Sequence, residues 1–246
     1  HWTKQDLLRQ ITDPCYFIDP VYGRCVMDGY AGARTDLSSA PSVDISNGAP
    51  TGADATNEIL LNYIDAPVLN GEVSRVQYST DGGRTWSSPQ TVSLPGDRAM
   101  YSAPSISPDG RKAYVVYNAD IDPWRGTDMT SPRRYHGVFR EADVNADGSV
   151  TGWTNVVVGP LGDLRASYPG HDIYQERIGD YVYSSASRTY GVGVENDLRN
   201  AEVCPAVQQY RAESIAAGTL ALPAPWPIAD CPATFGNLDI YALTSH

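Results

Sequence analysis

The stretch Ser79-Thr80-Asp81-Gly82-Gly83-Arg84-Thr85-Trp86 decides the fold, because it has the composition of a tight hairpin turn between two β-strands. The Asp81 carboxylate is placed to accept hydrogen bonds from the backbone of its own loop, while Gly82 and Gly83 permit a positive φ. Trp86 is expected to pack against apolar neighbours and so to fix the hairpin to its sheet. We therefore assign Asp81 a structural role in the turn rather than a catalytic one.

The composition is that of a globular protein with an acidic surface. The chain has 246 residues, of which 41% are hydrophobic, and this is enough for a substantial core. Acidic residues outnumber basic ones by 29 to 18, so the formal net charge of −11 argues against nucleic acid as a partner. No run of about 18 apolar residues is present, so we expect no membrane span. The chain begins at His1 without a signal peptide, which we interpret as a processed or trimmed start.

The cysteine content points to an oxidising compartment. Four cysteines are present, and none has the Cys-x-x-Cys spacing of a metal site. Three pairings are possible, and we favour the local ones, Cys15–Cys25 and Cys204–Cys231, each of which would close a loop rich in Pro and Gly. Because disulfides persist mainly in oxidising compartments, the expected location is secreted or extracellular.

A tetrapeptide recurs along the chain. Ser39-Ala40-Pro41-Ser42 returns 63 residues later as Ser102-Ala103-Pro104-Ser105, and a third unit begins at the same spacing near Arg165. Repeats of this length are typical of propeller blades, each made of four antiparallel strands. The predicted strands are 42–45, 58–64, 73–79 and 87–93; 105–107, 112–118, 134–143 and 154–158; and 178–187, 190–195 and 238–244.

The predicted fold class is therefore all-β, a β-propeller that is incomplete in this chain. The units cover 39–101, 102–164 and 165–246, after an irregular segment or partial blade at 1–38. The last unit contains an insertion at 201–235, closed by the Cys204–Cys231 bridge, with a helix predicted at 206–217. Because this unit has no obvious outer strand, its neighbour is expected from a lost part of the precursor or from a second chain.

Two motifs resemble one family of proteins. The pattern Ser-x-Asp-x-Gly-x-Thr-Trp at 79–86 resembles the Asp-box, or BNR, repeat of secreted bacterial sialidase-like β-propellers. The stretch 179–183, followed by 193–200 and 239–241, is similar to the final blade of such proteins, and the whole chain resembles their C-terminal part. The resemblance implies about three to four blades of a ring of about six. It also implies a carbohydrate ligand and hydrolysis of glycosidic bonds.

The resemblance further implies a set of catalytic residues. Sialidases of this superfamily use a tyrosine nucleophile activated by a glutamate, an aspartate acid/base and three arginines that clamp the substrate carboxylate. The nucleophile would be Tyr181 or Tyr190, and its base Glu195 or Glu176. Asp180 is a further catalytic candidate, although the family's acid/base aspartate lies in an early blade that this chain is not expected to contain; the candidate clamp residues are Arg134, Arg177, Arg188 and Arg199. The alternative is a non-catalytic propeller that serves as a binding or assembly module.

Two loops are expected to share one rim, because each follows the second strand of its unit. Their candidate ligand-binding residues are Asp122, Trp124, Arg125, Asn196, Asp197 and Arg199. Trp124 would offer a platform for sugar stacking, and His171 is expected to line the central pocket. The structural alternative is that Asp–Arg pairs merely tie each loop and that Asp122 stabilises the turn before Pro123.

One hairpin resembles half of a calcium loop. Asp143, Asn145 and Asp147 place oxygen ligands at alternate positions before Gly148, where the chain must turn. Thr154 stands where a bidentate acid is expected, and an Asn-Ala-Asp-Gly turn also forms without metal. Calcium is thus the one cofactor suggested, and none is required. The four histidines have no zinc spacing, and no Gly-x-Ser-x-Gly motif is present.

Overall fold

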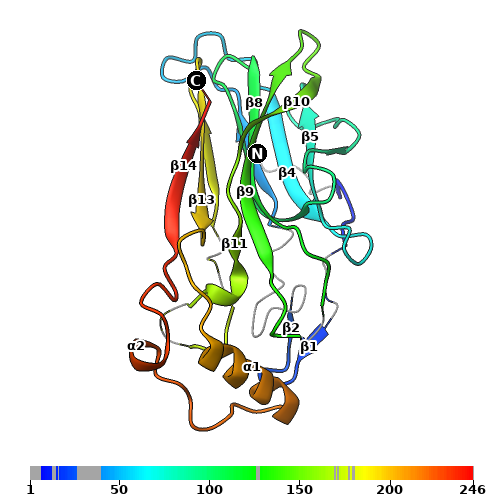
Figure 1. Ribbon diagram of the computed structural model, residues 1–246. Coiled ribbons are helices and arrows are strands. Elements are labelled where there is room, and N and C mark those ends of the chain that lie inside the picture. Colours follow the sequence, from blue (N-terminus) through cyan, green and yellow to red (C-terminus); the bar gives the residue numbers. More distant parts are fainter. Residues whose placement is uncertain are drawn as a thin grey trace.

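The structure is a computed structural model that describes residues 7–12, 15, 17–26, 40–125, 128–168, 170, 172–176, 178 and 181–245. Within these ranges the chain is mostly β, as expected, and every strand pairing is antiparallel. The described strands form three sheets and one short hairpin. The sheets stand side by side, and their strands run along the long axis of the molecule (Figure 1).

The first sheet has the strand order β3 (Ser42–Ile45), β4 (Ile59–Asp65), β5 (Val73–Ser79) and β6 (Gln90–Thr91). Strand β4 is apolar on both faces and almost wholly buried, as expected of a strand between two neighbours. The strands predicted at 42–45, 58–64 and 73–79 are confirmed. The outer strand is shorter than the predicted 87–93, since Pro89 cannot donate a hydrogen bond to a ladder.

The second sheet lies between the other two. Its order is β10 (Val150–Val158), β9 (Arg134–Val144), β8 (Lys112–Asp120) and β7 (Arg98–Ile106), and β11 (Gly162–Asp163) also pairs with β9. Alternate residues of β8 pack into two different hydrophobic cores. Tyr114 and Val116 face the third sheet, whereas Val115 and Tyr117 face the first. Strand β7 begins earlier than the predicted 105, because residues from Arg98 onward pair with the end of β8.

The third sheet consists of β12 (Tyr183–Ala186), β13 (Gly191–Asp197) and β14 (Asp239–Thr244), in that order. Strand β13 lies directly against the middle sheet. A Cβ atom on Gly191 would come within 2.6 Å of the Tyr114 ring, and one on Gly193 within 2.8 Å of Val116. Glycine at these two positions therefore allows the two sheets to approach so closely.

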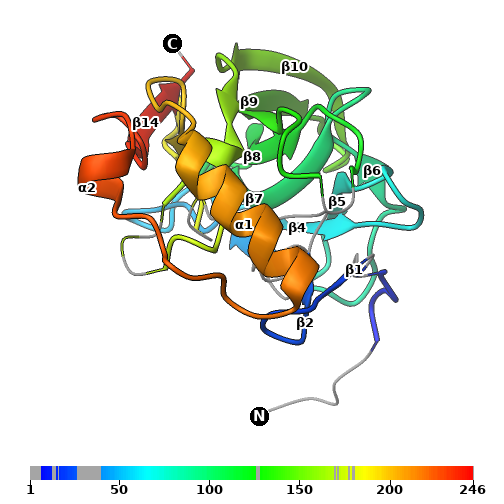
Figure 2. The same cartoon turned by 60° about the horizontal axis from the view of Figure 1, so that its bottom comes forward.

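Short helices and the two disulfides lie at the lower end of the molecule. Helix α1 (Pro205–Ala217) confirms the helix predicted at 206–217 and crosses this end beside the hairpin of β1 (Phe17–Asp19) and β2 (Arg24–Val26) (Figure 2). Disulfides join Cys15 to Cys25 and Cys204 to Cys231, the favoured pairs. The 3₁₀ helix η1 (Leu164–Ala166) and helix α2 (Pro227–Asp230) complete the elements. None of the described helices has the length and apolar character of a membrane span.

The hairpin after β5 has the internal bonding that its sequence predicts. Asp81 Oδ1 accepts hydrogen bonds from the backbone N–H groups of Arg84 and Thr85, each at 2.9 Å. Gly82 and Gly83 have φ values of 73° and 84°. The Trp86 indole donates to the Gly83 carbonyl at 3.1 Å. Asp81 is therefore engaged in holding the turn.

Candidate functional site

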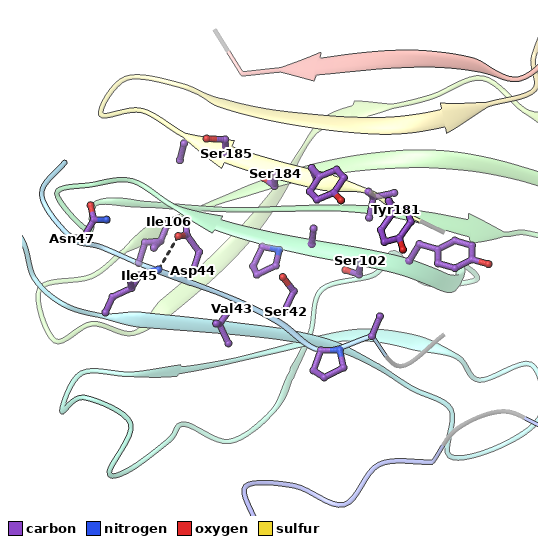
Figure 3. Close-up of a pocket in the computed structure, with 18 of the residues that line it drawn as sticks. Ser42, Val43, Asp44, Ile45, Asn47, Ser102, Ile106, Tyr181, Ser184 and Ser185 are labelled. Carbon is purple, nitrogen blue, oxygen red and sulfur yellow. Dashed lines mark hydrogen bonds between the residues drawn. The ribbon is translucent and has the colours of Figure 1, made fainter. Parts of the chain in front are cut away.

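The first strands of the three sheets line a common groove. Strands β3 and β12 both pack against β7, which lies between them (Figure 3). The groove between these strands has a volume of about 590 Å³. Residues of the recurring tetrapeptide line it from two strands: Pro41 and Ser42 near the start of β3, and Ser102 and Pro104 in β7. The repeated tetrapeptide therefore marks this site in the sequence as well as the spacing of the units.

Hydroxyl groups and one carboxylate provide the polar part of the groove. Ser42, Ser184 and Ser185 line the groove with hydroxyl groups, and the Ser184 hydroxyl lies 2.6 Å from that of the buried Ser105, which joins β12 to β7. Asp44 accepts hydrogen bonds from the backbone N–H groups of Ile45 at 2.8 Å and Ile106 at 2.9 Å (Figure 3). Among the described lining residues, Asp44 is the only acidic one. The groove thus offers hydrogen bonds with a single fixed charge.

Two exposed tyrosines form one wall of the groove. The side chains of Tyr181 and Tyr183 are 68% and 65% exposed, and their rings stack nearly in parallel, at an interplanar angle of 9° with 6.3 Å between centroids. Val43 and Ile45 are exposed on the opposite wall. Exposed aromatic faces beside hydroxyl groups suit a ligand that has both apolar and hydrogen-bonding surfaces, such as a sugar ring.

The groove also contains a strained backbone position. Tyr101 has a φ of 43°, an unusual value for a bulky residue, at a bulge where the β7–β8 register shifts between Met100 and Ser102. Strained conformations of this kind cluster at functional sites, so the bulge supports the choice of this groove as the candidate site.

Glu195, the candidate base, is buried between the second and third sheets. Its side chain is 1% exposed, and its Oε2 accepts a hydrogen bond from the Asn118 amide at 3.3 Å. Burial, together with the nearby charge of Asp197, raises the pKa of Glu195 to about 8. No hydrogen bond joins Glu195 to Tyr181 among the described residues, and their roles as base and nucleophile stay a prediction. Asp180 lies outside the described residues.

The alternative pair of candidates is also separated. Glu176 is buried and forms ion pairs with Arg133 at 3.1 Å and with Arg211 at 3.6 Å. Tyr190 lies in the turn between β12 and β13, where its carbonyl accepts a hydrogen bond from the backbone of Ser187. The buried tyrosine beside Glu195 is Tyr135, which was not among the candidates and donates to the Asn196 carbonyl at 2.9 Å.

The predicted rim residues of the first loop gather around Asp122. This carboxylate is almost buried and accepts a hydrogen bond from Arg134 Nη2 at 2.6 Å, with Arg125 Nη2 3.8 Å away. Burial acts to raise the pKa of Asp122, but the hydrogen bonds and charge of Arg134 outweigh burial and lower it. The Trp124 indole nitrogen is buried rather than presented to solvent. This geometry fits the alternative in which an Asp–Arg pair stabilises the loop and does not bind a ligand.

The other candidate arginines have separate partners. Arg199 pairs with Asp197 at 2.5 Å and lies over the Tyr241 ring, 3.8 Å from its centroid. Arg188 instead donates to backbone carbonyls of the loop after β3, including that of Ala49 at 2.6 Å. The remaining predicted ligand-binding residues, His171 and Arg177, lie outside the described ranges. A three-arginine clamp stays a prediction.

The residues of the predicted calcium loop form a hydrogen-bonded turn. Asp143 forms an ion pair with Lys112 at 2.8 Å. The Asn145 amide donates to the Ser149 hydroxyl at 2.9 Å, and Asp147 Oδ1 accepts from the Ser149 backbone N–H at 2.9 Å. Within the described ranges, no group of three or more His, Cys, Asp or Glu side chains is arranged to hold a metal ion.

The chain was compared with protein families, with curated proteins and with solved structures, and only the solved structures gave matches. No protein-family model and no curated protein matches the chain. Among solved structures, the sialidase of Trypanosoma rangeli in complex with sialic acid is similar over 71% of this chain and 27% of its own, with 14% identity and a TM-score of 0.36. A Hadza microbial sialidase is similar over 65% of this chain and 33% of its own, with 12% identity and a TM-score of 0.38. The chain thus spans about a third or less of the length of these structures.

Proposed function

We propose that this chain is part of a sialidase-like β-propeller that binds carbohydrate in the groove between β3, β7 and β12. The observation that carries this proposal is the exposed, parallel pair of Tyr181 and Tyr183 beside serine hydroxyls. Each tyrosine presents a ring face to a sugar, and the hydroxyls of Ser42 and Ser185, which line the groove and are not buried, supply hydrogen bonds at its edge.

The arrangement of the sheets supports the propeller part of the proposal. In each sheet the strand nearest the groove comes first in sequence, and the following strands lie progressively further out. We infer that the units 39–101, 102–164 and 165–246 are successive blades, about three to four of a ring of about six. The remaining blades come from a longer precursor or from a second chain. The native mass of protein from its source, compared with the mass of its denatured chains, distinguishes these two sources.

Binding without hydrolysis is the form of the function that the groove favours. Glycoside hydrolysis needs two suitably placed carboxyl groups, or a tyrosine–glutamate pair with an acid. The described lining has one carboxylate, that of Asp44, and both of its oxygens already accept backbone hydrogen bonds. A hydrolase that uses Tyr181 and Asp180 is the alternative. Release of a fluorophore from aryl sialosides, lost in Tyr181→Phe, would support that alternative.

The proposed location is secreted. Two disulfides close loops at the lower end of the molecule, and such bonds persist in oxidising compartments. The proposed ligand, an extracellular glycan, fits the same location.

A glycan array tests the binding proposal. Labelled wild-type protein is expected to bind a related set of glycans, and Tyr181→Ala is expected to lose that binding while keeping the far-ultraviolet circular dichroism of the wild type. Absence of any bound glycan, or an unchanged binding pattern for the variant, contradicts the proposal.

A further inference from the structure

A second cavity lies at the upper end of the molecule, between the first and second sheets. It has a volume of about 380 Å³ and is formed where three turns meet the start of β4. Thr80 comes from the hairpin after β5, Asp109 from the turn between β7 and β8, and Asn145 and Asp147 from the turn between β9 and β10. This cavity is separate from the carbohydrate groove and uses different residues.

Glu58 is the buried polar group of this cavity. Its side chain is 3% exposed, and its Oε1 has no hydrogen-bond partner. Both carboxylate oxygens lie 3.5 Å from the position that a Cβ atom on Gly148 would take, so the carboxylate faces the β9–β10 turn. A buried carboxylate without a partner costs free energy, which is relieved either by protonation, since burial raises the pKa of Glu58 to about 7, or by a counter-ion.

The cavity lining carries the charge of a cation site. Glu58, Asp109 and Asp147 line the cavity, but they are not grouped as a cluster of three, because Asp109 is engaged by Arg111 and by the Ser107 hydroxyl; Glu58 and Asp147 are the two carboxylates that remain for a cation. The Arg111 side chain is 83% exposed and lies 3.6 Å from Asp109, so it does not neutralise Glu58. The nearest charge that acts on Glu58 is the like charge of Asp147.

The ligand atoms favour one class of metal. The described lining has carboxylate, hydroxyl and amide oxygens but no histidine or cysteine, which disfavours zinc. Calcium accepts irregular sets of oxygen ligands, including neutral oxygens and water, whereas magnesium demands near-octahedral geometry. We propose that this cavity binds one calcium ion, with Glu58 as its buried ligand and Asp147 as the second carboxylate. The ion would join the first sheet to the hairpin of the second.

The test uses the whole chain, stripped with a chelator and then titrated with calcium. Calorimetry is expected to give one site, and free calcium about 100-fold above Kd is expected to raise Tm by on the order of 5 °C. Glu58→Gln keeps the shape but removes the charge, so it should lose both effects. Asp143→Asn is the matched control, because Asp143 belongs to the sequence-predicted loop but lies outside the cavity lining. It should behave like the wild type.

Several results would overturn the proposal. One is a wild-type Tm that is the same in calcium and in chelator. Another is a full calcium response in Glu58→Gln, or its loss in Asp143→Asn. An equal rise with magnesium or with sodium chloride of matched ionic strength would assign the effect to screening of the negative surface. If Glu58→Gln does not fold, Asp147→Asn takes its place with the same expected loss.

Discussion

The carboxylate of Glu195 occupies the space that a side chain on Gly137 would need. A Cβ atom at position 137 would lie 0.8 Å from Glu195 Oε2, so the two residues fit together only because one of them is glycine. Gly137→Ala is expected to displace this buried carboxyl group and to lower the free energy of unfolding by about 1–3 kcal/mol or more. Urea denaturation followed by fluorescence measures the change.

A double-mutant cycle isolates this contact. In a Glu195→Ala background, the Gly137→Ala change is expected to cost much less, because the displaced carboxyl group is absent. Equal costs in the two backgrounds would show that the steric relationship between these residues does not determine the loss.

The stability of the protein is expected to fall between pH 5 and pH 8. Glu195 has a pKa of about 8 in the folded chain, above its ordinary value of 4.5, because burial disfavours its charged form. The contribution of Glu195 to the free energy of unfolding is therefore fully present below pH 4.5, its ordinary pKa. This contribution is lost as the pH rises through about 8, its pKa in the folded chain. The limiting slope is about 1.4 kcal/mol per pH unit for one proton. Denaturation at several pH values should show a slope that is smaller in Glu195→Gln than in the wild type by up to this amount, since Glu58 and Glu72, whose pKa values are raised to about 7, add to the slope of both proteins.

The sequence predicted the sheets better than the candidate site, and the reason is physical. Strands such as β5 and β8 follow from local alternation, apolar content and turn residues, which a sequence displays directly. Asp81 was predictable for the same reason, since its partners lie within four residues. The burial of Glu195 depends on Gly137 and Asn118, which are distant in sequence and meet only when two sheets pack.

Side-chain direction explains most of the remaining differences. Trp124 follows a strand and looked like a sugar platform, but its indole nitrogen is buried. Asp122 and Arg134 do come together, and their ion pair ties the loop with the Asp122 carboxylate buried, whereas the Arg134 side chain stays 51% exposed. Glu58 could not be selected from sequence, because no local pattern shows that a carboxylate lacks a partner.

The tyrosine wall of the groove is expected to contribute strongly to glycan binding. Tyr181→Ala should weaken the affinity for a bound glycan about tenfold, because one stacking face is lost. Tyr190→Ala is the matched control, since Tyr190 is also an exposed tyrosine but lies outside the groove lining. Isothermal titration of both variants with the same glycan checks this expectation. Equal losses in the two variants would contradict the assignment of the site.

Asp81 is expected to affect stability and not binding. Asp81→Ala removes the acceptor for the Arg84 and Thr85 backbone groups, so Tm should fall while glycan affinity is unchanged. Hydrogen bonds from Thr85 and its neighbours lower the pKa of Asp81 to about 2. Its contribution is therefore present above its ordinary pKa of 3.8 and should disappear as the pH falls towards 2. Calorimetric melting at pH 2 and pH 6 separates these effects, and a variant with normal Tm at pH 6 would disprove this role.

Arg211 holds helix α1 to the lower end of the molecule. Its fully buried guanidinium donates to the backbone carbonyls of Ile173, Arg165, Ser167 and Gln175. Arg211→Met leaves these buried acceptors without a donor, and the expected loss is about 3–5 kcal/mol. Arg84→Met, at an exposed arginine, should change stability by less than about 0.5 kcal/mol. Guanidinium denaturation compares the two, and similar losses would contradict this account.

A structure of the chain bound to a glycan found on the array tests the central claim most directly. The account predicts a sugar ring against Tyr181 or Tyr183, within hydrogen-bonding reach of the serine hydroxyls of β3 and β12. A glycan bound at the Trp124 loop or elsewhere outside the groove would contradict it.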